Sequence, residues 1–279
     1  MDLTNPTQIK NLLERHNFHF SKTFGQNFLI TARIPEKIAE NALLDKDTTV
    51  LEIGPGIGCL TRCLAKQAKK VVTVEIDDRL IPILSETLGD LDNVQVVHGD
   101  ILKTDLPSLF AGEEQLAVCA NLPYTITTPI LVYLLESGLK FESITVMVQK
   151  EVAQRFCAEK GSKDYGAITL FLNYYAKPKM LFPVSAGNFL PMPRVDSAVL
   201  QLKAIDPPVD TDPKELFRVI RAAFSMRRKT LPNTLASAGI SKEATVAALE
   251  ALGKSPATRG EELGLSDYAA LVKELNKNV

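Results

Sequence analysis

The sequence has no tryptophan, only three histidines and four cysteines, and no apolar run long enough to cross a membrane. The cysteines form no CxxC pair, so neither a disulfide framework nor a zinc site is indicated. The first twenty residues are polar and mixed in charge, unlike a signal peptide. These absences predict a cytoplasmic protein without a metal site and without membrane association.

The chain also lacks a strong overall charge, since its formal net charge is -1. A nucleic-acid partner must therefore be held by a local basic surface rather than by the whole protein. One such segment runs from Lys214 to Leu231 and contains six basic residues against one acidic residue, Glu215.

A parallel sheet with crossover helices is indicated by short apolar or β-branched runs that alternate with helical patterns. The runs are Thr49 to Ile53, Val71 to Ile76, Val94 to His98, Leu116 to Ala120 and Ser143 to Val148. Two later runs, 168–172 and 198–202, are interpreted as further strands, paired antiparallel. The fold class is therefore α/β.

A proline-rich stretch, Asp206 to Pro213, is interpreted as a linker because prolines remove backbone donors and restrict the preceding residues. Beyond it, Phe217, Ile220 and Phe224 recur at helical spacing. Ser241, Pro256 and Ser266 are candidate starts of later helices, and Gly253 is a candidate helix end. We expect a sheet domain at 1–206 and a small all-α domain at 207–279.

Close-spaced glycines follow the first predicted strand, at Gly54, Gly56 and Gly58, and would let the backbone approach a ligand. This pattern is weak evidence alone. Glu75 follows at the end of the second strand, where a carboxylate can accept hydrogen bonds from ribose hydroxyls. Asp100 follows the third strand and could bond an adenine amine, although either acid could instead be a solvated loop residue.

The most informative segment is Asn121-Leu122-Pro123-Tyr124, which follows the fourth predicted strand. Asn121 Oδ1 and the Leu122 carbonyl could accept both hydrogens of an exocyclic amine, while Tyr124 offers a ring face to the base that carries it. The alternative is an ordinary strand-to-helix turn. Because the carboxyl ends of parallel strands share one edge, we expect Gly54, Glu75, Asp100 and Asn121 to border one cavity.

The sequence lacks the GxxxxGK[ST] motif that cradles nucleoside triphosphates. An adenosyl ligand without a phosphate requirement agrees better with the acids and glycines. S-adenosylmethionine is such a ligand, and its sulfonium would carry the group transferred to an amine held at Asn121.

The chain closely resembles the ribosomal RNA adenine dimethyltransferases of the KsgA type, nearly from end to end. Eight segments carry the resemblance: Phe24-Gly-Gln-Asn-Phe-Leu29, Leu51-Glu-Ile-Gly-Pro-Gly-Ile-Gly58, Val74-Glu-Ile-Asp77, Gly99-Asp100, Asn121-Leu-Pro-Tyr124, Asn188-Phe-Leu-Pro-Met-Pro-Arg-Val-Asp-Ser197, Ala222-Ala-Phe-Ser-Met-Arg-Arg-Lys-Thr-Leu231 and Arg259-Gly-Glu-Glu-Leu263. The family pattern commonly has Gln where Met226 stands, so this chain lacks a polar side chain at that position.

The resemblance implies a Rossmann-like methyltransferase sheet that uses S-adenosylmethionine to dimethylate two adjacent adenosines of small-subunit ribosomal RNA. It implies that Asn27 and Leu29 cover the cofactor and that Tyr124 and Phe189 sandwich the target base. Asn27 could instead cap a helix, and Phe189 could be ordinary core. We further assign four basic residues to RNA phosphates: Arg221, Arg227, Arg228 and Lys229. The expected partner is the immature 30S subunit, bound by a monomer.

Three alternatives share parts of this interpretation. A macrolide-resistance type methyltransferase acting on large-subunit RNA would use the same two pockets. A nicotinamide-dependent oxidoreductase would use the same sheet but has no need for the segment from Asn121 to Tyr124. A largely non-catalytic assembly factor for the small subunit would need the RNA-binding surface alone.

Overall fold

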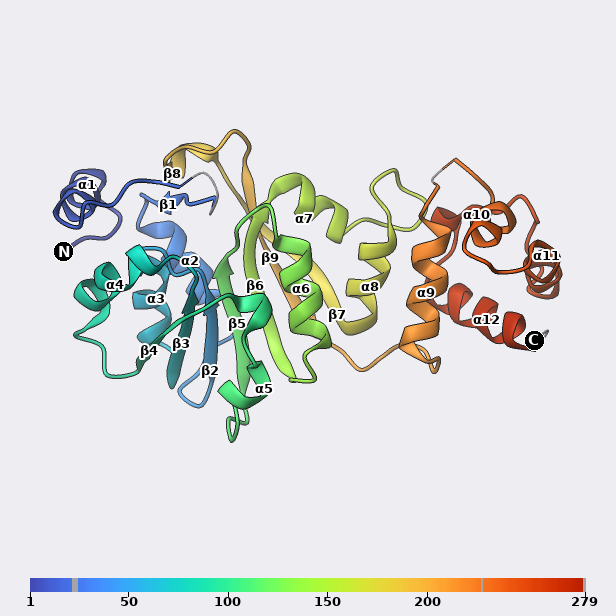
Figure 1. Ribbon diagram of the computed structural model, residues 1–279, viewed down its shortest axis with the longest axis horizontal. Coiled ribbons are helices and arrows are strands. Elements are labelled where there is room, and N and C mark those ends of the chain that lie inside the picture. The colour runs from blue at the N-terminus through green and yellow to red at the C-terminus, as the bar shows by residue number, and fades with distance from the viewer. Residues whose placement is uncertain (22–24, 227, 278–279) are drawn as a thin grey trace. The chain divides into compact units, whose positions relative to one another are not determined.

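The structure is a computed structural model that describes residues 1–21, 25–226 and 228–277 (Figure 1). Contacts divide the chain into two compact units. The sheet unit comprises Met1–Ala153 with Lys179–Ala204, and the helical unit comprises Gln154–Pro178 with Ile205–Val279. The sequence predicted a division into 1–206 and 207–279, which assigns residues 154–178 to the sheet domain. In the structure, the contacts of residues 154–178 group them with the helical unit.

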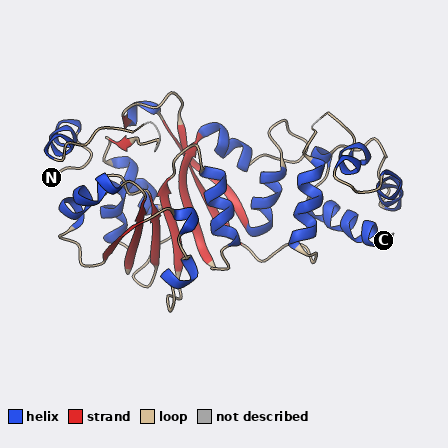
Figure 2. Ribbon diagram, in the orientation of Figure 1, coloured by secondary structure: helices blue, strands red, loops and turns tan. Residues whose placement is uncertain are grey.

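A seven-stranded sheet forms within the described residues, in the order β4-β3-β2-β5-β6-β9-β7. The strands are β2 (Thr49–Ile53), β3 (Lys70–Glu75), β4 (Val94–His98), β5 (Leu116–Asn121), β6 (Phe141–Gln149), β7 (Ala176–Val184) and β9 (Ser197–Ala204). The pairs from β4 through β6 are parallel, and β9 runs antiparallel to β6 (Figure 2). All five predicted parallel strands are therefore confirmed, as is the run at 198–202.

This strand order places a switch point at β2. Along the chain, β2 is the first strand of the sheet, the next two strands are added on its β3 side, and the following strands are added on its β5 side. The register places Glu75 beside His98, and Asn121 beside Met147. The carboxyl ends of four adjacent strands therefore lie along one edge of the sheet.

The helices of the sheet unit are α1 (Pro6–Arg15), α2 (Arg33–Glu40), α3 (Cys59–Ala65), α4 (Ile81–Leu88), α5 (Leu106–Leu109), α6 (Thr127–Glu136) and the start of α7 (Lys150–Phe156). Leu60 and Leu64 of α3 pack with Ile38 of α2 and the strands in one apolar cluster. A second cluster joins α1 and α4 through Phe18 and Phe28. Phe28 belongs to β1 (Phe28–Leu29), which pairs antiparallel with β8 (Phe189–Leu190).

The helical unit contains α8 (Ala167–Tyr175), α9 (Pro213–Ala223), α10 (Leu231–Ser237), α11 (Lys242–Ala251) and α12 (Leu265–Asn276). Phe217 of α9 packs against the rings of Phe171 and Tyr174 of α8, with centroids 5.1 and 5.2 Å apart. The predicted strand at 168–172 is wrong, because this short apolar run buries its side chains as part of helix α8. Short apolar runs do not distinguish a buried strand from a buried helix.

The predicted helix limits have mixed outcomes. Ser241 caps α11 through a bond from Ala244 N, 3.1 Å long, and Gly253 follows that helix with a φ of +66°. The starts predicted at Pro256 and Ser266 are wrong: residues 256 and 257 form a turn, and α12 begins at Leu265 with Gly264 as its cap. Among the described residues, no helix has the length and apolarity needed to cross a membrane.

Candidate active site

A cavity lies at the carboxyl ends of β2, β3, β4 and β5, at the switch point of the sheet. Its wall contains nine of the predicted site residues, namely Asn27, Leu29, Gly54, Gly56, Glu75, Asp100, Asn121, Leu122 and Tyr124. The prediction that strand-end residues meet at one cavity is therefore confirmed. Ligands of open α/β sheets bind at this position.

The glycine loop after β2 has a conformation that side chains would obstruct. Gly54, Gly56 and Gly58 have φ values of +65°, +60° and +89°. A Cβ on Gly56 would lie 3.1 Å from the Phe28 ring, and one on Gly58 would lie 2.8 Å from Leu88 Cδ2. The positive φ values favour glycine at all three positions, and Gly54 and Gly56 line the cavity.

Glu75 closes the cavity at the end of β3, where its side chain is only 5 % exposed. Burial raises the pKa of this carboxyl to about 7, and the nearby Asp77 carboxylate acts in the same direction. The backbone N–H of Asp77 donates to Glu75 Oε1 over 2.9 Å. The backbone of Asp77 thus fixes the position of one carboxylate oxygen of Glu75. When it is ionised, the carboxylate can accept hydrogen bonds from hydroxyl groups.

Asp100 has a structural role as well as a place in the cavity wall. Its Oδ1 accepts a bond from Leu102 N, 3.0 Å long, at the start of a short 3-10 turn, η2 (Ile101–Lys103). Lys103 Nζ lies 3.7 Å from Asp100 Oδ2. The half-buried carboxylate is held by its own turn, which orients it at the cavity.

Glu52 lines the same cavity, although sequence reasoning assigned it no role. It is the only acid of β2, it is 1 % exposed, and its Oε2 is buried without a hydrogen-bond partner among the described residues. Burial raises the pKa of Glu52 to about 8. A signal was available in the sequence, because an acid inside the apolar strand Thr49–Ile53 is costly to bury without a purpose.

Asn121 ends β5, and its amide orientation is fixed by the N-terminal segment. Its Nδ2 donates to the Asn27 carbonyl oxygen over 3.2 Å. A carbonyl accepts only, so the nitrogen must point to Asn27 and Oδ1 is left for another donor. Among the described residues nothing donates to Asn121 Oδ1 or to the Leu122 carbonyl, whereas Leu122 N is bonded to Met147 O at 3.1 Å.

Tyr124 lies beside these acceptors with its ring anchored. Its hydroxyl lies 2.6 Å from Ser197 Oγ at the start of β9, and burial raises its pKa. Thr127 Oγ1 donates to the Pro123 carbonyl over 3.1 Å, which connects the turn to α6. The ring is half-buried and lines the cavity.

Two predictions taken from the resemblance have different outcomes in the structure. Asn27 caps no helix, since β1 follows it directly, and it lines the cavity. Phe189 is 2 % exposed, pairs with Leu29 between β8 and β1, and packs in the core cluster of α2 and α3. Its side chain is not part of the cavity wall, and its contact with a base stays a prediction.

The predicted RNA contacts lie in the helical unit. Arg221 is exposed in the last turn of α9, and Arg228 and Lys229 are exposed in the turn that follows. Arg227 and Phe24 fall outside the described residues. Met226 is 37 % exposed, so it is a surface residue of the same turn.

The observed features of the cavity fit S-adenosylmethionine. Gly54 and Gly56 bring backbone without side chains to the cavity, Glu75 and Asp100 present carboxylates, and Glu52 Oε2 is buried there without a hydrogen-bond partner among the described residues. No group of three potential metal ligands occurs among the described residues. The fold and the site together define a Rossmann-like methyltransferase whose cofactor is S-adenosylmethionine.

The chain belongs to the ribosomal RNA adenine dimethylase family, whose model matches residues 17–277. It is 44% identical over 270 residues to "Ribosomal RNA small subunit methyltransferase A" of Clostridium perfringens, covering 96% of this chain and 95% of the relative. The protein of the same name from Geobacillus kaustophilus is 46% identical over 284 residues, covering 98% and 97%.

Solved structures agree with this assignment. A dimethyladenosine transferase from Plasmodium falciparum superposes with a TM-score of 0.77 at 28% identity, covering 89% of this chain and 97% of that one. The 23S rRNA methyltransferase ErmE superposes with a TM-score of 0.68 at 29% identity, covering 90% and 100%.

Proposed function

We propose that this protein transfers methyl groups from S-adenosylmethionine to the exocyclic amines of two adjacent adenosines in a hairpin loop near the 3′ end of small-subunit ribosomal RNA. The names of the relatives at 44% and 46% identity support the choice of RNA. The likeness to the dimethyladenosine transferase from Plasmodium falciparum supports dimethyladenosine as the product.

The observation that carries the proposal is the pair of free acceptors at the end of β5. Asn121 Oδ1 and the Leu122 carbonyl border the same cavity as Glu75 and Asp100. An exocyclic amine has two hydrogens, and two acceptors can hold both of them. The proposal therefore assigns amine binding to Asn121 and Leu122 and base stacking to Tyr124.

The chemical problem is that the adenine amine is a weak nucleophile, because its lone pair is delocalised into the ring. Holding both hydrogens out of the ring plane localises the lone pair as the nitrogen becomes pyramidal. This stabilisation is stronger in the transition state than in the ground state. Bound S-adenosylmethionine supplies an electrophilic methyl group on a positively charged sulfur.

No dedicated general base is required. Once the nitrogen has formed its bond to the methyl carbon it carries a positive charge, and its proton becomes strongly acidic. That proton leaves to water or to a neighbouring carbonyl oxygen. A second cycle on the same amine needs a fresh cofactor molecule and room for the first methyl group.

The remaining residues hold the cofactor, the base and the RNA backbone in this proposal. The cofactor is held by Asn27, Leu29, Gly54, Gly56, Glu75, Asp100 and Asn121. Phe189 faces the base opposite Tyr124, an assignment that rests on the family resemblance alone. Arg221, Arg227, Arg228 and Lys229 neutralise RNA phosphates. The protein acts as a cytoplasmic monomer on the immature 30S subunit.

Mass spectrometry of RNA from isolated ribosomal subunits tests the proposal. Unmethylated small subunits and large subunits are incubated separately with the protein and S-adenosylmethionine. We expect adjacent dimethyladenosines in the small-subunit RNA alone. Methylation of large-subunit RNA alone would favour the alternative of a large-subunit methyltransferase, and ErmE is a 23S rRNA methyltransferase.

A second arm measures how much of the function is binding. A Glu75→Ala variant should still bind immature small subunits while losing methyl transfer. Full rescue of subunit maturation by this variant would favour the assembly-factor alternative over the catalytic one.

A further inference from the structure

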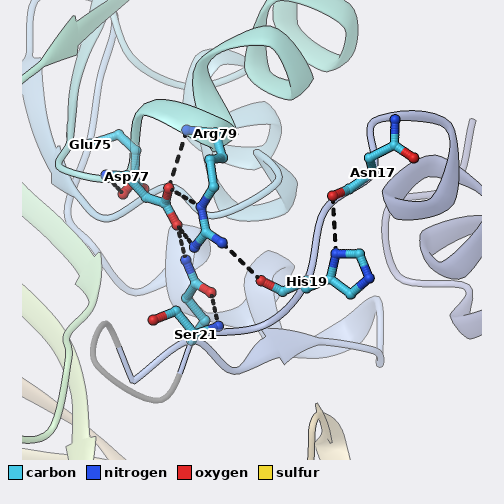
Figure 3. A network of polar contacts seen from close by, with 7 residues as sticks. Asn17, His19, Ser21, Glu75, Asp77 and Arg79 are labelled. Atoms are coloured by element: carbon cyan, nitrogen blue, oxygen red, sulfur yellow. Dashed lines mark hydrogen bonds and ion pairs between the residues drawn. The ribbon is translucent and has the colours of Figure 1, made fainter.

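Asp77 is a buried acid just beyond the cavity wall, and it connects three parts of the sheet unit. It is 1 % exposed. Its Oδ2 accepts a bond from Gln26 Nε2, 2.6 Å long. Its two oxygens also accept bonds of 2.8 and 2.6 Å from Arg79 (Figure 3). Its backbone N–H donates to Glu75 Oε1.

The N-terminal segment is tied to this acid at more than one point. Ser21 N donates to Gln26 Oε1 over 3.0 Å. Arg79 donates to the His19 carbonyl over 3.2 Å (Figure 3). The Arg79 guanidinium also lies 5.0 Å from the centre of the Phe18 ring. Gln26 is therefore held from both ends of its amide, by Ser21 and by Asp77.

The residue after Gln26 orients the amide of Asn121. The Asn27 carbonyl accepts the bond from Asn121 Nδ2, and Asn27 Nδ2 donates to the Gly25 carbonyl over 2.9 Å. A displaced Asn27 carbonyl would release the Asn121 amide, which could then turn and present its nitrogen where an acceptor is needed. Such a turn places a donor against the amine hydrogens.

We infer that Gln26 and Asp77 are positioning residues that connect the cofactor-binding carboxylate of Glu75 to the amide of Asn121. The path runs from Glu75 through the Asp77 backbone and carboxylate to Gln26, then through the Asn27 carbonyl to Asn121. This inference rests on the function proposed above. It adds Asp77, which lies outside the cavity wall, and Gln26, which lines the cavity beside Asn27, as residues that set the orientation of Glu75 and Asn121.

The competing explanation is that the bonds only fasten the N-terminal segment to the fold. Three phenylalanines already attach this segment by apolar contacts. The ring centres of Phe20 and Phe28 lie 5.3 Å apart, and those of Phe18 and Phe28 lie 6.2 Å apart. A fastening role predicts a lower Tm without a change in the turnover of the folded enzyme. A positioning role predicts a change in turnover.

The test substitutes Gln26→Leu, which removes both amide contacts and leaves the Asp77–Arg79 pair in place. The matched control is Gln95→Leu at an exposed position of β4. Four quantities are measured: the Kd of S-adenosylhomocysteine by calorimetry, the Tm, and the kcat and KM for methyl transfer to small-subunit RNA. We expect Gln26→Leu to raise the Kd and lower kcat by about tenfold each, the order expected for a lost bond to a charged group.

A double-mutant cycle with Asn121→Ala identifies the route. If Gln26 acts through Asn121, Gln26→Leu should change kcat by less than about twofold in the Asn121→Ala background, because no amide remains to be oriented. Its effect on the Kd should persist there. Gln26→Glu keeps the side-chain shape but places a second carboxylate against that of Asp77, and the two like charges repel. This variant should lose at least as much turnover as Gln26→Leu.

The outcomes separate this inference from the proposed function. Gln26→Leu behaving like Gln95→Leu in kcat and Kd would overturn the inference, as would an undiminished kcat loss in the Asn121→Ala background. A wild-type protein that transfers no methyl group to small-subunit RNA would refute the proposed function instead. The calorimetric arm would then still report whether Gln26 supports the cofactor site.

Discussion

The sheet unit and the helical unit present their candidate functional residues in opposite ways. In the sheet unit, Glu52 and Glu75 are buried at the cavity, and burial raises their pKa values to about 8 and about 7. In the helical unit, Arg221, Arg228 and Lys229 are exposed on and after α9. Oriented bonds to a small ligand need desolvated groups, whereas attraction of RNA phosphates needs exposed charges whose effect depends on salt.

The largest expected effect concerns the oriented acceptor of the sheet unit. Asn121→Ala removes the amide, and we expect a 10²- to 10³-fold fall in kcat, about 3 to 4 kcal/mol, by analogy with loss of one preorganised polar group. Single-turnover transfer to small-subunit RNA measures this. The exposed Asn11 of α1 provides a matched Asn→Ala control. Activity within tenfold of wild type would remove Asn121 from its assigned role.

The next effect concerns the charge of Glu75. Glu75→Gln should raise the Kd of S-adenosylhomocysteine about 10- to 100-fold, because a charged acceptor of hydroxyl bonds becomes neutral. Calorimetric titration measures the change. An unaltered Kd would mean that the ribose is held elsewhere.

The same carboxyl predicts a pH dependence of cofactor affinity. Its pKa is raised to about 7, with Asp77 and Glu52 as the neighbouring acids. The ionised form can accept hydrogen bonds from hydroxyl groups with both oxygens, whereas protonation turns one oxygen into a donor and removes the charge, so affinity should fall as the pH is lowered through 7. The Glu75→Gln variant should lack this fall. A wild-type profile that is flat between pH 6 and 8 would contradict the assignment.

The helical unit should respond quite differently to charge removal. Arg221→Ala, Arg228→Ala and Lys229→Ala should each weaken RNA binding about fivefold and lower the salt slope by roughly 0.7 to 0.9, while kcat at saturating RNA stays unchanged. Lys242→Ala, at an exposed position of α11, is the control. Binding measured across a salt series decides the point, and equal slopes for all four variants and wild type would make these residues ordinary surface charges.

The smallest effect concerns stability. The pKa of Glu52 is raised to about 8, from an ordinary value of 4.5. A raised pKa means that stability is full below pH 4.5 and is lost as the pH rises through 8, because the buried carboxyl must then ionise. Glu52→Gln should lessen the fall in Tm between pH 6 and pH 9 by a few degrees, since 1 kcal/mol corresponds to about 2–4 °C in a chain of this size. Equal falls in both proteins would show that Glu52 does not resist ionisation.

The sequence predicted the sheet well because its strands are β-branched runs bounded by turns, as at Thr49–Ile53 and Val94–His98. It failed at 168–172, where a short apolar run carries no periodicity that separates a strand from a helix. Once the parallel strands were predicted, their shared carboxyl edge was enough to bring Gly54, Glu75 and Asn121 together.

What sequence reasoning missed depends on contacts between distant segments. Gln26 and Asp77 are 51 residues apart, and nothing local to either residue indicates their bond. The bond from Asn121 to the Asn27 carbonyl spans 94 residues. Glu52 differs from these residues, because its signal is local: it is an acid inside the buried apolar strand Thr49–Ile53.

A structure of the protein with S-adenosylhomocysteine and a small-subunit RNA hairpin that contains adjacent adenosines tests the central claim most directly. The account predicts one adenine out of its stack beside Tyr124, with its amine nitrogen within hydrogen-bond distance of both Asn121 Oδ1 and the Leu122 carbonyl. It also predicts the ribose of the cofactor product on Glu75. An adenine amine bound away from the end of β5, or a cofactor product outside this cavity, would contradict it.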